Sequence, residues 1–157
     1  LSGADLIDES LPRFIEESID AAGVSGERLT FEMSESALMG NLAAGRYWIE
    51  RMSRLGAHFV LYDFGSGLGA FVFLRDLDVD QVKLGRDIVG SLAVNGEHHE
   101  FVGAIRSLVE SQGKTAVAAF VETDHMLESV REIGFTLGQG YQLEEPSAEL
   151  RHGTTVE

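Results

Sequence analysis

The chain of 157 residues has no cysteine, few basic residues and no long apolar run. Without cysteine it forms neither disulfides nor thiolate metal sites. It has 12 lysines and arginines against 26 aspartates and glutamates, a formal net charge of −14, so its own field repels nucleic acids and anionic lipids. No apolar stretch approaches the roughly 18 residues of a membrane span, and the N-terminus lacks a basic-then-apolar signal. We therefore expect no nucleic-acid polymer as partner, no membrane insertion and a cytoplasmic location.

The composition also limits the size of the fold and the kind of ligand. The length suits one domain, and 44% apolar residues are typical of a soluble globular protein with an ordinary core. An anionic ligand would need help against the negative charge, most simply from a divalent metal held by carboxylates.

Apolar residues alternate between helical and strand spacing along the whole chain. The spacing predicts helices over 6–22, 42–55 after an Asn41 cap, 97–112 and 123–133, with a short apolar turn near 71–74. It predicts strands over 29–34, 58–63, 79–84, 115–121 and 135–139, and a polar tail after them. This alternation favours parallel strands with helical crossovers. Two α/β architectures stay open, a doubly wound sheet and a piece of a β/α barrel, although no dinucleotide-binding glycine motif opens the first strand.

The strand over 58–63 ends in an acid and runs into a glycine-rich loop. Asp63 is followed by glycines at 65, 67 and 69, and glycine tolerates the positive φ angles that a tight loop over a ligand needs. Parallel α/β proteins place their sites at such strand ends. An ordinary turn with a solvated aspartate is equally consistent with this local pattern.

Alternate residues of a strand point to the same face, and in each predicted strand one of the two faces carries the more polar side chains. In a barrel this face points to the lumen, where Glu32, Tyr62, Lys83 and Ala119 would lie at comparable heights. A carboxylate and a lysine converging there would resemble a site. The alternative is an interior Glu32–Lys83 ion pair without chemistry.

Five short motifs follow one another at intervals typical of one protein family. They are LTFEMSES at 29–36, DFGSG at 63–67, DQVKL at 80–84, VAAFVE at 117–122, and QGY at 139–141 followed by Pro146. These motifs resemble, in order, L-x-x-E-x-T-E-S, D-D-F-G-T-G, D-x-x-K-I-D, A-E-G-V-E and Q-G-Y-x-x-x-x-P of the EAL-domain family, bacterial phosphodiesterases that hydrolyse cyclic di-GMP. The resemblance covers residue 1 to about 148 and implies an incomplete (β/α)8 TIM-type barrel.

The resemblance also implies a metal site at the top of the barrel. There Mg²⁺ or Mn²⁺ would clamp the phosphodiester and generate a hydroxide nucleophile. By motif position, Glu32 and Asp63 match metal ligands, and Lys83 matches a catalytic residue that orients water or stabilises charge. Around them, Glu35 matches the glutamate that anchors the glycine loop. Asp63, Gly65, Gly67 and Gln139 match ligand-binding positions, Gln139 at the far wall of the pocket.

Several positions depart from the family pattern where the chemistry would occur. Tyr62 replaces the first aspartate of the D-D pair, and a phenol does not substitute for a carboxylate that bridges two metal ions. Ala119 replaces the glutamate of A-E-G-V-E, and Phe120 replaces the glycine after it. Gly85 replaces the aspartate of K-I-D, and Glu145 precedes the closing proline where the family has a basic residue.

The resemblance predicts a partial EAL domain over 1–148, without the first two strands, and a polar C-terminal tail over 149–157. An eight-stranded barrel does not close from these elements alone, so we expect exposed strand edges. A longer parent chain or another copy of the chain would cover them.

These observations favour a degenerate, non-catalytic EAL domain that acts as a regulatory or protein-interaction module in cyclic di-GMP signalling. No cofactor is expected for such a module, and a protein partner or self-association is expected. One alternative is a receptor that binds cyclic di-GMP without hydrolysing it. Another is an active metal-dependent phosphodiesterase, with Mg²⁺ or Mn²⁺ held by Glu32, Asp63 and Glu122.

Overall fold

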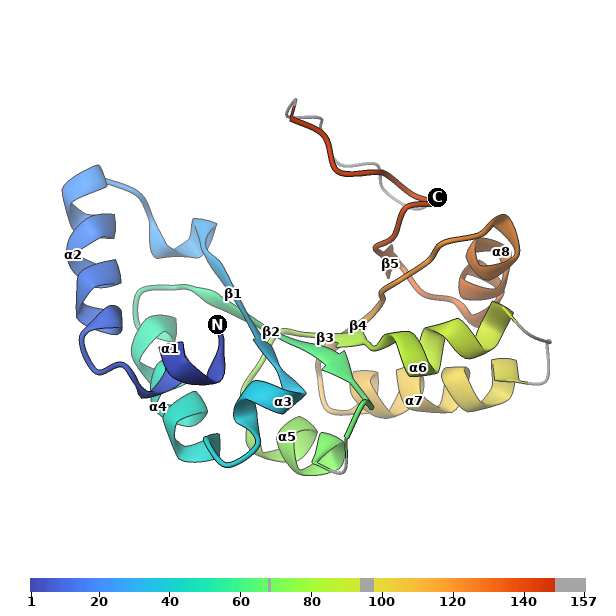
Figure 1. The fold of residues 1–157 in the computed structure, drawn as a ribbon, viewed down its shortest axis with the longest axis horizontal. Helices are drawn as coiled ribbons and strands as arrows, with labels where there is room; N and C mark the ends of the chain where they lie inside the picture. The colour runs from blue at the N-terminus through green and yellow to red at the C-terminus, as the bar shows by residue number, and fades with distance from the viewer. Residues whose placement is uncertain (68, 94–97, 149–157) are drawn as a thin grey trace. The chain divides into compact units, whose positions relative to one another are not determined.

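A computed structural model describes residues 1–67, 69–93 and 98–148. The chain divides into two compact units, Leu1–Gln81 and Val82–Glu157. In both units short strands alternate with helices (Figure 1).

The first unit carries two strands and the helices around them. Its elements are α1 (Gly3–Ile7), α2 (Leu11–Ala22), the 3₁₀ turn η1 (Gly26–Arg28), β1 (Thr30–Ser34), α3 (Glu35–Leu38), α4 (Leu42–Ser53), β2 (His58–Phe64) and α5 (Ala70–Asp76). β1 and β2 pair in parallel, with Glu32 opposite Val60 and Ser34 opposite Tyr62. Because side chains alternate along a strand, this register places Glu32 and Tyr62 on the same face, with Tyr62 two residues further along.

Aromatic side chains form the centre of the first unit's core. Trp48 on α4 and Phe59 on β2 have no exposed surface. The ring of Phe31 on β1 meets both, with centroids 6.1 Å from Trp48 and 5.5 Å from Phe59. The indole Nε1 of Trp48 donates a hydrogen bond of 3.2 Å to the carbonyl of Leu6, which holds α1 against α4. The buried indole therefore keeps its polar atom paired.

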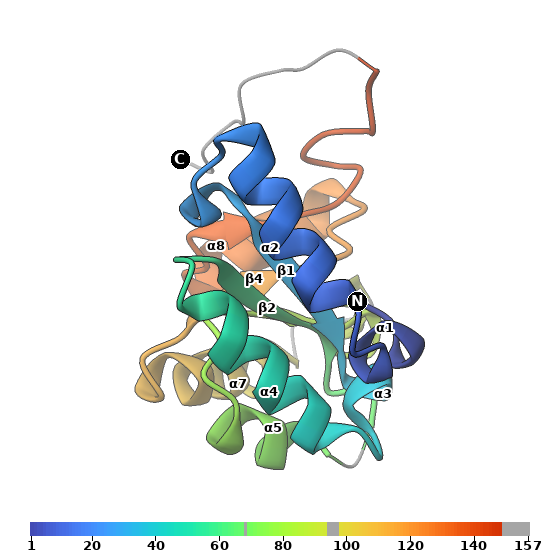
Figure 2. The same cartoon turned by 90° about the vertical axis from the view of Figure 1, so that its left-hand side faces the viewer.

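Helices α2 and α4 run beside each other in the first unit (Figure 2). The guanidinium of Arg51 on α4 donates two hydrogen bonds of 2.6 Å to the carboxylate of Glu16 on α2. A third bond, of 2.5 Å, goes to the hydroxyl of Tyr47. This bidentate pair joins residues 35 positions apart and fixes the position of α2 along α4.

The second unit continues the alternation of strands and helices. Its elements are β3 (Gln81–Leu84), which begins at the boundary, α6 (Arg86–Val89), the 3₁₀ turn η2 (Gly90–Ala93), α7 (His99–Ser111), β4 (Thr115–Ala118), α8 (Asp124–Ile133) and β5 (Leu137–Gly138). β4 lies between β3 and β5, and β4 and β5 pair in parallel, with Val117 opposite Leu137. Fully buried valines of α7 pack toward β4.

The predicted α/β class with parallel strands alternating with helices is confirmed. The predicted helix over 6–22 is wrong as one element, because the chain is extended at Asp8 between α1 and α2. The carboxylate of Asp8 accepts hydrogen bonds from the backbone amide and the hydroxyl of Ser10, at 2.8 Å and 2.6 Å. Such local side-chain bonds compete with helical ones.

Other predicted boundaries of helices and strands also differ from the structure for local reasons. Asn41 precedes α4, but its side chain donates to the carbonyl of Ala37 instead of capping the helix. The strand predicted over 115–121 ends at Ala118, because Phe120 has a left-handed φ of 61°. Of the helix predicted over 97–112, Glu97 lies outside the described residues, as does the tail over 149–157.

Candidate functional site

The carboxylate of Glu35 lies beneath the glycine loop that follows β2. Ser34 caps α3 by accepting a hydrogen bond from the amide of Ala37, which places Glu35 at the first helical position. The Glu35 side chain is 1% exposed and accepts hydrogen bonds from the backbone amides of Gly65 and Gly69, at 3.0 Å and 3.1 Å. A Cβ on Gly67 would lie 2.8 Å from Glu35 Oε1, so the Glu35 carboxylate would have to shift to admit a side chain there.

The acids expected as metal ligands occupy β1 and β2 of the first unit. Glu32 is half-buried on β1, and its backbone carbonyl accepts a hydrogen bond of 2.5 Å from the N-terminal ammonium of Leu1. Asp63 is half-buried near the end of β2 and has a left-handed φ of 58°, unusual for a residue other than glycine. Tyr62, just before it, is 37% exposed. Glu32 and Tyr62 thus share one face of the strand pair.

The other predicted site residues belong to the second unit. Lys83 is half-buried on β3, three residues before the start of α6. The backbone amide of Gln139 donates a hydrogen bond of 2.8 Å to the backbone carbonyl of Ala118. The backbone carbonyl of Gln139 accepts one of 3.0 Å from the backbone amide of Val121. The backbone of Gln139 is therefore fixed to the end of β4. The convergence of the Glu32 and Lys83 side chains, expected from the strand pattern, stays a prediction.

A cation, a ring and an acid meet after β3 and β4 of the second unit. Arg86 donates two hydrogen bonds to the carboxylate of Glu122, at 2.8 Å and 3.3 Å. The guanidinium carbon of Arg86 also lies 4.7 Å from the ring centroid of Phe120. Ala119, beside the ring, is 7% exposed. Glu122 directly precedes Thr123, the cap of α8, which begins at Asp124.

The described residues offer no ready set of ligands for a divalent metal. Within residues 1–67, 69–93 and 98–148, no three histidine, aspartate or glutamate side chains are arranged to hold one. Glu122, which the sequence offered as a third ligand, is instead bound to Arg86. Among the described residues, no helix is long and apolar enough to cross a membrane.

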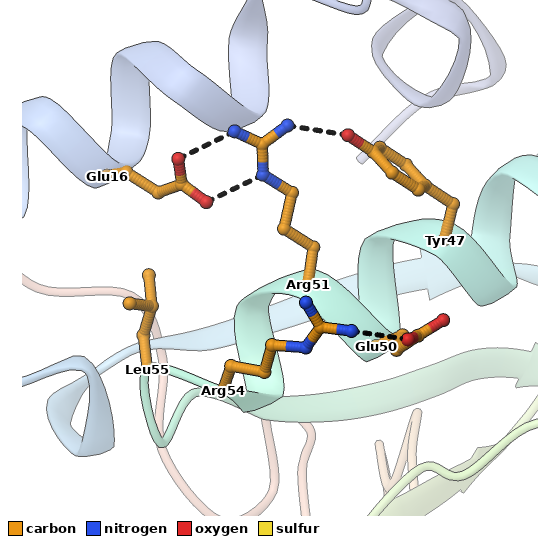
Figure 3. Close-up of a pocket in the computed structure, with 6 residues that line it drawn as sticks. All are labelled: Glu16, Tyr47, Glu50, Arg51, Arg54 and Leu55. Carbon is orange, nitrogen blue, oxygen red and sulfur yellow. Dashed lines mark hydrogen bonds and ion pairs between the residues drawn. The ribbon is translucent and has the colours of Figure 1, made fainter.

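A groove between α2 and α4 contains none of the predicted site residues. Its lining consists of Glu16, Tyr47, Glu50, Arg51, Arg54 and Leu55 (Figure 3). The hydrogen bonds from Arg51 hold the pKa of Glu16 below its usual range. Arg54 pairs with Glu50 at 2.5 Å, so both cations are matched by acids. The Glu16–Arg51 pair was not predicted, because no local sequence pattern relates residues 35 positions apart.

Comparison with known proteins identifies relatives in cyclic di-GMP metabolism. Residues 1–146 match the EAL domain family. The chain is 32% identical over 146 residues to the cyclic di-GMP phosphodiesterase PdeB of Shewanella oneidensis, covering 93% of this chain and 17% of PdeB. It is 30% identical over 146 residues to the cyclic di-GMP phosphodiesterase NbdA of Pseudomonas aeruginosa, covering 93% of this chain and 18% of NbdA. The chain thus spans less than a fifth of the length of these relatives.

Solved structures of EAL domains have the same fold. The FimX EAL domain superimposes with a TM-score of 0.91 at 27% identity, covering 98% of this chain and 62% of that one. The FimX EAL domain of Pseudomonas aeruginosa bound to c-di-GMP gives a TM-score of 0.87 at 28% identity, covering 94% of this chain and 60% of that one. The similarity confirms both the predicted family resemblance and the predicted fold class of a partial barrel. The chain belongs to the EAL domain family.

Proposed function

We propose that this chain is a degenerate, non-catalytic EAL domain that acts in cyclic di-GMP signalling as a regulatory or protein-interaction module and does not hydrolyse the nucleotide. One observation carries the proposal: Tyr62 and Ala119 stand where the family motifs have acids, and Glu122, three residues after Ala119, is bound to Arg86. A phenol and a methyl group do not replace carboxylates that hold metal ions. Loss of single ligands or of their supporting groups commonly costs orders of magnitude in affinity or rate.

The proposal includes the surroundings of the domain. We infer that 1–148 is the EAL portion and 149–157 a polar tail, that the protein works in the cytoplasm, and that it associates with a protein partner or with itself. Exposed apolar side chains in the first unit support association. Ile7, Phe14 and Phe71 are 65%, 64% and 67% exposed, and a partner that covers such side chains removes apolar surface from water.

A hydrolysis assay tests the proposal. Cyclic di-GMP is incubated with the protein and with Mg²⁺ or Mn²⁺, and the nucleotides are separated to detect the linear dinucleotide. We expect none above the background of buffer alone, while an active EAL phosphodiesterase in the same buffer converts the substrate. Hydrolysis that disappears in Glu32→Ala and persists in Glu27→Ala, an exposed glutamate outside the motifs, would overturn the proposal in favour of an active phosphodiesterase.

A second candidate is a receptor that binds cyclic di-GMP and leaves it intact. The glycine loop and the buried carboxylate of Glu35 beneath it support this candidate, as does the FimX EAL domain bound to c-di-GMP. Calorimetric titration with cyclic di-GMP tests it. Saturable heat with recovery of the intact nucleotide is the expected result, and absence of heat at millimolar ligand would exclude the receptor.

A further inference from the structure

A groove between α1 and α4 of the first unit lies outside the positions that the family motifs mark. Its lining consists of Leu6, Ile7, Asp8, Glu9, Ala44 and Tyr47, and we call this surface the Tyr47 groove. The first two residues belong to α1, the two acids follow it, and the last two lie one turn apart on α4. Its volume of about 590 Å³ is typical of ligand-binding cavities, so it has room for a few side chains of a partner.

Hydrogen bonds hold the walls of the Tyr47 groove in place. The indole of Trp48 donates to the carbonyl of Leu6 and fixes α1 against α4. On α4, the hydroxyl of Tyr47 accepts a hydrogen bond from Arg51, whose guanidinium is also bound to Glu16 (Figure 3). A partner therefore meets a preformed groove, which lowers the entropic cost of binding.

Two large apolar side chains of the groove remain open to solvent. Ile7 is 65% exposed and Tyr47 is 49% exposed, whereas Leu6 is 3% exposed. A partner side chain that covers Ile7 and Tyr47 removes apolar surface from water, which is favourable. The Tyr47 ring already attracts one cation, since the guanidinium carbon of Arg51 lies 5.8 Å from its centroid. The groove therefore suits an apolar side chain with a cation next to it.

The rim of the groove is acidic. Asp8 and Glu9 are exposed, and none of the described residues that line the groove is basic. Hydrogen bonds from the hydroxyl and the backbone amide of Ser10 hold the pKa of Asp8 below its usual range, so this carboxylate stays charged in mild acid. The chain as a whole carries a charge of −14 and attracts cationic partners from a distance. Charge complementarity therefore selects a basic partner.

The same charges disfavour a second copy of the chain in the groove. A copy brings another charge of −14 to the contact. Arginines of its first unit are already paired with acids, as in Arg13–Glu17 and Arg54–Glu50. A basic segment of another protein meets neither obstacle.

We infer that the Tyr47 groove binds a basic, apolar segment of a protein partner. An apolar side chain of the segment packs against Ile7 and Tyr47. A neighbouring lysine or arginine pairs with Asp8 or Glu9. The inference rests on the proposed role as a protein-interaction module and adds to it the face that is used and the chemistry of the partner.

Titration of the whole chain with synthetic peptides tests the inference. The probe is a fluorescent amphipathic peptide with leucines on one helical face and lysines on the other. One comparison peptide has serine for each leucine, and a second has glutamate for each lysine. Binding is followed by fluorescence anisotropy, for the original chain and for Ile7→Ser and Glu9→Gln.

Each variant has a matched control outside the groove. Phe14→Ser matches Ile7→Ser, because Phe14 is 64% exposed in the same unit and does not line the groove. Glu128→Gln on α8 matches Glu9→Gln, because it removes one exposed negative charge elsewhere. Since all four side chains are exposed, the variants should fold as the original chain does, and circular dichroism verifies this.

We expect Ile7→Ser to weaken binding of the leucine–lysine peptide about tenfold. Glu9→Gln should weaken it about two- to fourfold, as for an exposed ion pair, and the controls should not change it. Both comparison peptides should bind about tenfold more weakly than the probe. Absence of binding, or equal losses in the control variants, would overturn the inference.

Sedimentation of the original chain and of Ile7→Ser tests the other occupant. A dimer that is lost in Ile7→Ser and kept in Phe14→Ser would assign the groove to a second copy and overturn the inference. Hydrolysis of cyclic di-GMP would overturn the proposed function without changing the peptide titration, so the two failures are distinguishable. The expected result is a monomer that binds the leucine–lysine peptide through the groove.

Discussion

Glu35 accepts a hydrogen bond of 3.0 Å from the backbone amide of Gly65, a residue 30 positions further along the chain. The other oxygen of the same carboxylate accepts from Gly69 at 3.1 Å. With 1% of its surface exposed, Glu35 has exchanged water for these two amides. Burial of an acid requires such compensation, so the glycine loop and the position of α3 stabilise each other.

Glu35→Ala should lower the free energy of unfolding by about 2 kcal/mol, since a buried hydrogen bond to a charged acceptor is worth about 1.5–3 kcal/mol. The two loop amides would lose their acceptor, and the loop would become more mobile. Urea unfolding measures the loss, and hydrogen exchange at Gly65 and Gly69 locates it. Glu17→Ala, on the exposed side of α2, is the control and should unfold as the original chain does. Unchanged exchange at the loop in Glu35→Ala would contradict the anchoring role.

Gly140→Ala should destabilise the second unit by more than about 2 kcal/mol. A Cβ at this position would lie 2.1 Å from the carbonyl oxygen of Val121 and 2.4 Å from its amide nitrogen, and backbone atoms have little room to move. Thermal or urea unfolding gives the change.

Gly103→Ala is the opposite case in the same unit. Gly103 lies inside α7, and the nearest atom to an added Cβ is a methyl group of Ile133 at 3.7 Å, an ordinary contact. Because alanine favours the helix over glycine, stability should rise by about 0.5–1 kcal/mol. Destabilisation by Gly103→Ala as large as that by Gly140→Ala would show that space at the backbone does not explain either result.

The stabilising effect of the Glu16–Arg51 pair should depend on pH. The pKa of Glu16 is held below its usual range by the hydrogen bonds from Arg51. A lowered folded-state pKa stabilises the fold above the unfolded-state value, about 4.3 for a glutamate, and this contribution disappears as pH falls through the folded-state pKa. The urea midpoints of the original chain and Glu16→Gln should therefore differ at pH 7 and converge in acid.

The control for this experiment is Glu50→Gln, which removes the partner of the more exposed Arg54. Its midpoint should match that of the original chain, because exposed pairs contribute little. A gap between the original chain and Glu16→Gln that stays constant down to strong acid would contradict the assignment of the effect to the charge of Glu16.

Millimolar Mg²⁺ or Mn²⁺ should leave the melting temperature unchanged, and a chelator should have no effect. A ligand that binds only the folded chain raises its stability with concentration, and the described residues offer no three-ligand set for a metal. Differential scanning calorimetry over a range of metal concentrations makes the measurement. A rise in melting temperature that depends on metal concentration and is lost in Glu32→Ala would indicate a metal site.

Features that depend on neighbouring residues could be predicted well. The helix predicted over 123–133 is found as Asp124–Ile133, with Thr123 accepting a hydrogen bond from the amide of Met126 as its cap. The strand predicted over 58–63 is found as His58–Phe64, one residue longer than predicted. Predictions were poorer where short-range alternatives compete, as at Asp8, or where the backbone leaves the extended region, as at Phe120.

The candidate site shows the same division. The motif match identified Glu35 as an anchor, and the alternative of an active phosphodiesterase made Glu122 a candidate metal ligand. The structure places the first under the glycine loop and the second against Arg86, 36 residues away. No pattern within the motif around Glu122 could distinguish a metal ligand from the partner of an arginine.

The sequence alone determined the α/β alternation, the strong negative charge, the absence of thiol chemistry and the EAL family motifs, because composition and periodicity are properties of the chain itself. Only the tertiary structure decided which distant groups meet: Glu35 with the glycine loop, Glu16 with Arg51, and Glu122 with Arg86 beneath the exposed ring of Phe120. These pairings depend on how elements 30 or more residues apart pack together, and that packing sets which carboxylates are buried, paired or open to a ligand.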